Sequence, residues 1–282
     1  ALNADTPMQP GAGIPMATDI AFALGVLALL GSRVPASLKI FLTALAVMDD
    51  LGAIVVIAIF YTTQFSPAYL LASLAVFGVL VVLNRLRVMS LLPYLLGGVL
   101  MWFLMLKSGV HATIAGVLLA FAIPFTGRAE DDASPSHRLE HWLHKPVAFL
   151  VLPIFALANT GIIVAAGWDQ ELLSSNSLGI LGGLVIGKPL GIFLASFLAV
   201  SVGLCALPGD IKWRHIFGAG LLGGIGFTMS IFITNLAFAG NVDLINASKM
   251  AILMASLVAG GFGFLWLRLA NSLEKSTNQG VC

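Results

Sequence analysis

Long apolar stretches, separated by short polar ones, make up almost the whole chain. Continuous runs of about 20 apolar residues predict helices that cross a bilayer, whereas a transmembrane barrel would show alternating strands of about ten residues. We therefore predict an all-α polytopic membrane protein with one transmembrane domain over residues 1–282. Its nine spans are expected at residues 12–32, 37–62, 67–84, 89–106, 109–125, 146–167, 177–202, 214–239 and 245–267.

Two of the nine spans carry helix-breaking patterns near their middles. In the first span, Pro15 is followed by Thr18 and Asp19, which are residue types that start helices. The eighth span holds a cluster of glycines and then hydroxyl side chains, at Gly223, Gly224, Gly226, Thr228 and Ser230. Close packing of small residues is the alternative interpretation of the glycines. We predict that both spans unwind, and their opposite directions and faint similarity favour an inverted repeat with its broken helices beside a substrate site.

The composition agrees with a helical membrane protein, since the mean hydropathy is +1.01 and only 10% of the residues are charged. A net charge of +1 gives no indication of a nucleic acid or another acidic partner, so membrane lipid is the expected surroundings. The two cysteines, Cys205 and Cys282, form no disulfide framework. The sequence contains no glycine-rich phosphate-binding loop, so we expect neither a nucleotide nor another cofactor.

The distribution of the cations predicts the orientation. Eleven lysines and arginines lie on alternate connections or after the last span, at Arg33, Lys39, Arg85, Arg87, Arg128, Arg138, Lys145, Lys212, Arg214, Arg268 and Lys275. The opposite side carries only Lys107 and Lys249. By the positive-inside rule, the eleven mark the cytoplasmic side. We expect residue 1 to lie outside the cell and the C-terminus and both cysteines to lie inside.

Four ionisable side chains remain at membrane depth: Asp19, Asp49, Asp50 and Lys188. Burying one ionised carboxylate there costs roughly 2.5–3.5 kcal/mol on insertion scales, so such residues mark ion or proton pathways. A chance polar pair on a solvated face is the alternative for Asp49 and Asp50, but their span has no solvated face. Snorkelling is the alternative for Lys188, which lies about a dozen residues from either end of its span.

These four groups also predict the kind of cargo. Three acids against one base leave two negative charges in excess, so the group must take up protons, a metal cation, or each in turn. Carboxylate oxygens, the Thr18 hydroxyl and freed backbone carbonyls are hard ligands suited to a hard metal cation. The same carboxylates bind protons when burial and mutual repulsion disfavour their charged form. Adjacent helix positions point about 100° apart, so one acid can face a cavity while its neighbour meets a partner.

The longest charged connection is expected at residues 126–145, on the cytoplasmic side. It carries Arg138, Glu140, His141 and His144, and imidazole side chains titrate near physiological pH. A pH-sensing segment and a plain solvated loop are both compatible with this pattern.

Six motifs, in order along nearly the whole chain, make this sequence similar to the NhaA family of sodium/proton antiporters. They are ATDIAFALG at 17–25, KIFL at 39–42 with DDLGA at 49–53, KSGVHAT at 107–113, RLEH at 138–141, GKPLG at 187–191 and GFTMS at 226–230. The resemblance implies an inverted-repeat antiporter fold. It also implies that the protein exchanges cytoplasmic sodium or lithium for external protons across the bacterial inner membrane. It implies a pH-regulated secondary transporter rather than an enzyme.

The resemblance also assigns roles to particular residues. Asp49 and Asp50 would form the cation and proton site, with Asp50 as the more direct sodium ligand and Lys188 as the partner of Asp49. Thr18 and Asp19 would lie where the broken helices cross, together with the segment that contains Gly224, Gly226 and Thr228. The four residues Arg138, Glu140, His141 and His144 would form a pH-sensing cytoplasmic mouth.

Members of the family have twelve spans, so the nine predicted here would correspond to the fourth through the twelfth. We interpret the opening at Ala1, in a polar segment, as the interior of a longer protein. The first three spans, and with them a contact of the family homodimer, would then be absent. Two alternatives stay open: a truncated fragment that does not transport, and a cation-coupled symporter of a small organic acid, for which Lys188 and Asn159 are the available binding groups.

Overall fold

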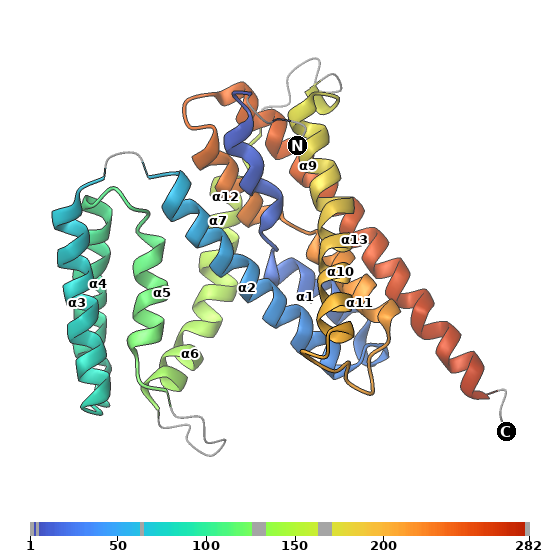
Figure 1. Cartoon of the computed structure of the whole chain (residues 1–282), viewed down its shortest axis with the longest axis horizontal. Helices are drawn as coiled ribbons and strands as arrows, with labels where there is room; N and C mark the ends of the chain where they lie inside the picture. Colours follow the sequence, from blue (N-terminus) through green and yellow to red (C-terminus); the bar gives the residue numbers. More distant parts are fainter. Residues whose placement is uncertain (1–2, 4–5, 63–64, 126–133, 163–170, 280–282) are drawn as a thin grey trace. The chain divides into compact units, whose positions relative to one another are not determined.

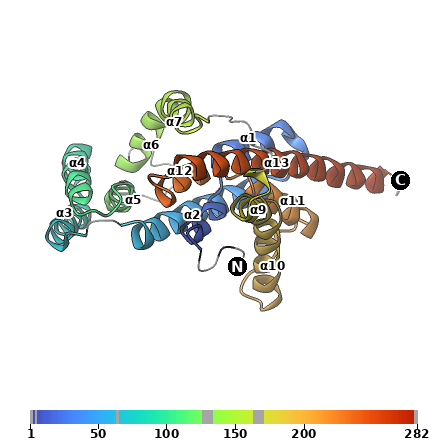
Figure 2. The same cartoon turned by 90° about the horizontal axis from the view of Figure 1, so that it is seen from above.

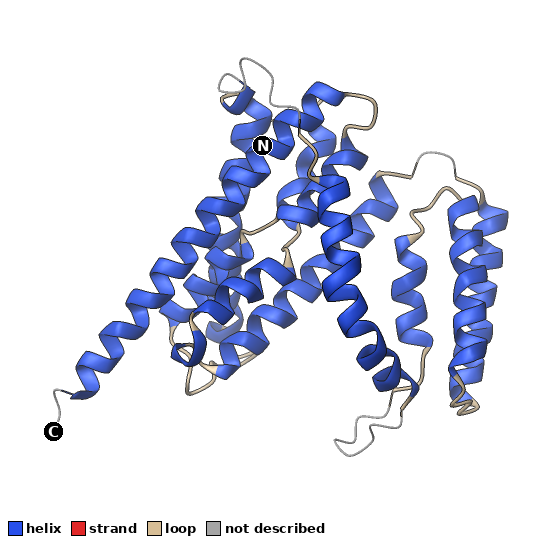
Figure 3. Cartoon of the chain, turned by 180° about the vertical axis from the view of Figure 1, so that it is seen from behind, coloured by secondary structure: helices blue, strands red, loops and turns tan. Residues whose placement is uncertain are grey.

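The computed structural model describes residue 3 and residues 6–62, 65–125, 134–162 and 171–279. Every regular element in these ranges is a helix, as Figure 3 shows, which confirms the predicted all-α class. The chain divides into two compact units, residues 1–53 with 159–282, and residues 54–158. Each unit is described by itself below.

The first unit carries both predicted breaks. Its elements are η1 (Gln9–Met16), α1 (Ile20–Leu29), η2 (Gly31–Arg33), the first part of α2 (Ala36–Phe60), α9 (Ser175–Gly182), η4 (Gly183–Gly187), α10 (Lys188–Ser201), α11 (Trp213–Gly223), α12 (Phe227–Ala237) and α13 (Val242–Gln279). Helix α11 packs against both α10 and α13, and the long α13 also contacts α9 and α12 (Figure 1). The core of this unit joins α1, α2, α11 and α13 through residues such as Leu27, Leu42, Leu222 and Leu267, all at most 1% exposed.

The second unit consists of the rest of α2, α3 (Pro67–Arg85), α4 (Leu91–Lys107), α5 (Thr113–Ala122), α6 (Pro135–Pro146), η3 (Val147–Val151) and most of α7 (Leu152–Asn159). Helices α3, α4 and α5 lie side by side (Figures 1 and 2). Two buried clusters hold them together, one around Leu80 and Tyr94 and the other around Met101 and Met105.

The predicted spans correspond to apolar helices in the described residues. Six helical stretches are long and apolar enough to cross a membrane: Gln9–Leu29, Ala36–Phe60, Pro67–Arg85, Pro135–Asn159, Ser175–Ser201 and Val242–Ala270. The pair α11 and α12 forms a seventh, bent by 45° at its break. The shorter apolar helices α4 and α5 take the places of the predicted fourth and fifth spans. The protein is therefore a multi-pass membrane protein.

The start of the sixth span was predicted wrongly. Instead of beginning at residue 146, the helix begins at Pro135, inside the connection that we expected at 126–145. Ser134 accepts a hydrogen bond from the His137 N–H and Pro135 occupies the first turn, which are both common at helix starts. The apolar pattern does not predict this helix start, because the polar side chains of residues 135–146 interrupt the apolar run. Residues 126–133 and 163–170, and Cys282, lie outside the described residues.

Two short π-helical segments, η3 and η4, interrupt the spans that contain them. Each is followed at the same spacing by a proline, Pro153 after Val151 and Pro189 after Gly187. A proline has no N–H to donate to the carbonyl four residues earlier, so the backbone widens there into longer-range hydrogen bonds. The segment η4 ends directly before Lys188, which places that lysine at a distortion of its span.

Candidate functional site

The two interrupted spans meet in the first unit. The 3₁₀ helix η1 ends at Met16 and α1 begins at Ile20, while α11 ends at Gly223 and α12 begins at Phe227. The backbone N–H of Asp19 donates to the carbonyl oxygen of Ile225, at 2.6 Å, so one break is bonded directly to the other. This confirms the predicted unwinding of both spans. We call the meeting point of residues 16–20 and 223–228 the crossing.

The carboxylate of Asp19 joins the N-termini of two half-helices. One oxygen accepts from the Phe22 N–H in the first turn of α1, at 3.1 Å. The other accepts from both the N–H and the hydroxyl of Thr228 in the first turn of α12, at 3.0 and 2.6 Å. Helix N-termini carry partial positive charge and unsatisfied N–H groups, so a buried carboxylate stabilises both ends at once. With the side chain only 4% exposed, these bonds engage both of its oxygens.

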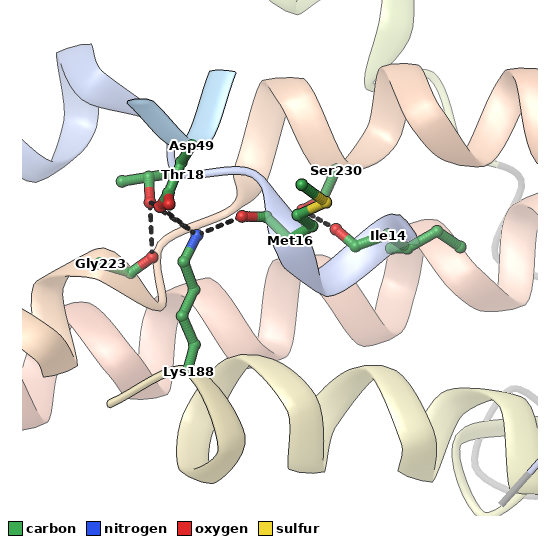
Figure 4. Close-up of polar contacts among 7 residues, drawn as sticks. All are labelled: Ile14, Met16, Thr18, Asp49, Lys188, Gly223 and Ser230. Atoms are coloured by element: carbon green, nitrogen blue, oxygen red, sulfur yellow. Dashed lines mark hydrogen bonds and ion pairs between the residues drawn. The ribbon is translucent and has the colours of Figure 1, made fainter. Parts of the chain in front are cut away.

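The C-terminal ends at the crossing are held by donors from other elements (Figure 4). The ammonium of Lys188 donates to the carbonyl oxygen of Met16, the last residue of η1, at 2.8 Å. The hydroxyl of Ser230 donates to the carbonyl oxygen of Ile14, at 2.7 Å. The carbonyl oxygens of Ile14 and Met16 are therefore already hydrogen-bonded in this structure.

Lys188 and Asp49 form an ion pair, with 3.0 Å between Nζ and Oδ2. The Thr18 hydroxyl lies beside both, 2.6 Å from the ammonium and 2.6 Å from the same carboxylate oxygen (Figure 4). It also lies 3.1 Å from the carbonyl oxygen of Gly223, the last residue of α11. A hydroxyl has one proton, so Thr18 accepts from Lys188 and donates either to Asp49 or to Gly223.

Asp50 differs from Asp49 in having a carboxylate oxygen without a hydrogen-bond partner. Its Oδ1 is the only buried carboxylate oxygen without a hydrogen-bond partner within the described ranges. Adjacent positions on a helix point about 100° apart, so Asp49 is directed to Lys188 while Asp50 is directed elsewhere. A buried polar group without a partner is costly, which makes this oxygen ready to bind a cation or a proton.

Glycines let the backbones approach closely around Lys188. A Cβ atom added to Gly224 would collide with the carbonyl oxygen of Leu184, in the π-helical segment before Lys188. A Cβ atom added to Gly220 would lie 3.1 Å from the carbonyl oxygen of Pro189. At Gly226 the neighbouring atom would be the side-chain oxygen of Ser230. The glycines therefore bring α11 and the break next to the helix that carries the lysine.

One residue of this network was missed at the sequence level. The hydroxyl of Ser256, on α13, accepts the Phe227 N–H at the start of α12, at 3.1 Å. No sequence signal distinguishes Ser256 from an ordinary small residue of a packed span. Its role depends on where the break ends, and sequence patterns locate such boundaries only to within a few residues.

The predicted pH-sensing residues belong to a different part of the chain from this network. Arg138, Glu140, His141 and His144 are all on α6, in the second unit, and all four are exposed. The spacing of Glu140, His141 and His144 puts them on one helical face.

Comparison with known proteins identifies the chain. The family model described as "Na+/H+ antiporter 1" matches residues 1–267. The chain belongs to this antiporter family. A relative named Na(+)/H(+) antiporter NhaA, from Dechloromonas aromatica, is 78% identical over 94% of this chain and 69% of its own length. Another from Flavobacterium johnsoniae is 59% identical over 98% of this chain and 72% of its own length, and one from Helicobacter pylori is 49% identical over 94% and 69%.

Membership in the antiporter family gives the crossing a functional context. The six motifs quoted from the sequence include Thr18, Asp19, Asp49, Asp50, Lys188 and Thr228. Five of these six are joined in one network of hydrogen bonds and ion pairs, together with the backbone of both breaks. Asp50 is the sixth, and it follows Asp49 directly on α2.

Proposed function

We propose that this chain is a secondary sodium/proton antiporter in which Asp50 and Asp49 bind sodium and protons in competition. The single observation that carries the proposal is the unpartnered, buried oxygen of Asp50 beside a neighbouring acid that is already paired. A carboxylate in this condition is stabilised either by a hard cation or by a proton. One oxygen cannot hold both, so loading one ion releases the other.

Asp49 and Lys188 act in this proposal as a latch. When Asp49 is ionised, it holds the lysine at the C-terminal end of η1, and Thr18 links the pair to the end of α11. Protonation of Asp49 would remove the charge that pairs with Lys188 and free the ammonium. The state of the acid pair would thereby change the contacts that fix both broken helices, which suits a transporter whose access alternates by movement of one bundle.

The cation distribution supports the orientation in this proposal, with the side rich in lysine and arginine in the cytoplasm. The ion gradients set the direction of exchange: protons would enter the cell down their gradient while sodium or lithium leaves. The protein would lie in the bacterial inner membrane, with lipid as its surroundings and the proton gradient as its energy source. No nucleotide and no resident cofactor is required.

The exposed group on α6 would set the pH range of the exchange. Replacing His141 and His144 with glutamine should move the pH–activity profile along its axis, because the change removes two ionisable side chains from the exposed group that would sense pH. The matched control is His137→Gln, on the same helix but stacked on Phe125. A profile that stays in place in the double variant would leave α6 without a sensing role.

The site itself is tested by Asp50→Asn. An asparagine keeps the shape of the side chain but carries neither the charge nor the exchangeable proton, so sodium-driven proton movement in everted vesicles should be lost. The control is Asp210→Asn, which changes an exposed acid in the same unit and should leave exchange intact. Exchange near the unmodified level in Asp50→Asn would overturn the assignment.

A further inference from the structure

An apolar cavity of about 550 Å³ lies in the first unit, between the start of α2, the last part of α10 and the chain that joins α10 to α11. Its lining includes Ile40, Phe41, Ala199, Leu207 and Ile216, and is almost entirely hydrophobic. A volume of roughly 300–1,000 Å³ is typical of sites that bind small molecules. No residue of the crossing lines this cavity, so it is separate from the proposed exchange site.

The cavity opens near the ends of membrane spans and extends into them. Ala195, the lining residue of α10 farthest from the end of that helix, is six residues before Ser201. At 1.5 Å per residue this places it roughly 9 Å inside the span. On α2, the lining reaches from Ser37 to Phe41, in the first turns after Ala36. The cavity therefore lies at the depth where head groups give way to acyl chains.

The chain segments at this end carry an excess of positive charge. Arg33 and Lys39 belong to the α2 side, and Lys212 and Arg214 follow the connection after α10. Lys39 stands between the lining residues Ser37 and Ile40, and Lys212 follows the lining residue Ile211. Asp210 is the one acid in residues 203–216. Four cations against one carboxylate favour a negatively charged group beside the cavity.

We propose that the cavity binds one acyl chain of an anionic phospholipid, with the lipid phosphate among these cations. The apolar lining fits a hydrocarbon chain, and the hydroxyls of Ser37 and Ser196 give a free phosphate ion few partners there. Basic clusters between spans on the cytoplasmic side are suited to anionic head groups. Each nearby lysine or arginine should strengthen binding of an anionic over a zwitterionic lipid by about fivefold.

Labelling of Cys205 can report whether the cavity is occupied, because this residue lines the cavity, is exposed and is a free thiol. The protein with Cys282→Ser would be reconstituted into phosphatidylcholine vesicles with or without a one-third share of phosphatidylglycerol. The rate of Cys205 labelling by a neutral, membrane-permeant maleimide should fall severalfold with phosphatidylglycerol. A control cysteine at the exposed Ala239, in a Cys205→Ser background, should be labelled at the same rate in both.

Two variants separate the cations from the apolar cavity. Lys39→Gln, at an exposed position, should weaken the preference for phosphatidylglycerol by about fivefold, measured by native mass spectrometry of the lipid retained. Ala199→Phe, which fills the cavity, should abolish retention of either lipid. The matched control Lys107→Gln, an exposed cation on the opposite side of the membrane by the cation distribution, should retain the lipid as the unmodified protein does.

Three results would overturn the proposal. Equal protection of Cys205 by both vesicle types would mean that surrounding lipid fills the cavity without head-group selection. Protection of Cys205 in phosphatidylcholine vesicles that contain added oleate, but not in those that contain phosphatidylglycerol, would identify a free fatty acid as the occupant. Absence of protection by any of these lipids would mean that the cavity takes no acyl chain.

Discussion

At the scale of single residues, the crossing is held by charges that each serve more than one element. Lys188 pairs with Asp49 and also holds the end of η1, while Asp19 holds the starts of α1 and α12. A buried ion pair stabilises a protein weakly by itself, but the removal of one partner leaves an uncompensated charge and is strongly destabilising. The network therefore makes the fold of the crossing depend on the charge state of its acids.

A double-mutant cycle of Lys188→Gln and Asp49→Asn tests the latch. Each single change should lower the free energy of unfolding by about 3–5 kcal/mol, because it leaves the other charge without its partner. The exposed fraction of the side chain left behind is 21% for Asp49 and 8% for Lys188. The double variant should lose less than the sum, with a coupling of about 1–3 kcal/mol in thermal unfolding. Strictly additive losses would mean that the pair does not act as a unit.

Much of this residue network was predictable because buried charges must be balanced. Three acids and one lysine at membrane depth implied that one acid pairs with Lys188 while another stays available, and the structure places Asp49 and Asp50 in those two conditions. The contacts of Thr18 and Ser256 with backbone atoms were not predictable. They depend on where a helix ends in space, which side-chain patterns do not specify.

At the scale of elements, helix breaks were easier to locate than helix distortions. Proline followed by Thr18 and Asp19, and the glycines at 223–226, located both breaks correctly because these residues disfavour a continuous helix. The π segments escaped prediction, since prolines are also tolerated in spans without that distortion. The helix of the sixth span starts earlier than its apolar run, because the polar helix α6 precedes the apolar residues of η3 and α7.

A substitution at Gly224 tests whether the close approach of the backbones at the break matters. Gly224→Ala should destabilise the protein by about 1–3 kcal/mol and impair exchange, because its Cβ would collide with the backbone oxygen of Leu184, which cannot rotate away. The matched control is Gly261→Ala on α13, where an added Cβ meets no atom within 4 Å. Equal thermal stability of the two variants would mean that close approach at Gly224 does not matter.

At the scale of the whole molecule, the cation distribution along the connections predicts one orientation, with residue 1 outside the cell. A cysteine at Glu171, in a background with both Cys205→Ser and Cys282→Ser, should react with an impermeant thiol reagent added outside intact cells. A cysteine at Leu86 should react only after lysis, since it adjoins Arg85 and Arg87 on the side rich in cations. Equal labelling of both positions in intact cells would contradict the predicted orientation.

The central claim is that sodium and protons compete for the same carboxylates, and proton release on sodium binding tests it most directly. Calorimetric titration of the purified protein with sodium chloride, in two buffers of different ionisation enthalpy, measures the protons released for each sodium bound. Choline chloride provides the control for ionic strength. We expect proton release in the unmodified protein and in Asp210→Asn, and none in Asp50→Asn. Sodium binding whose heat is the same in both buffers would contradict the account.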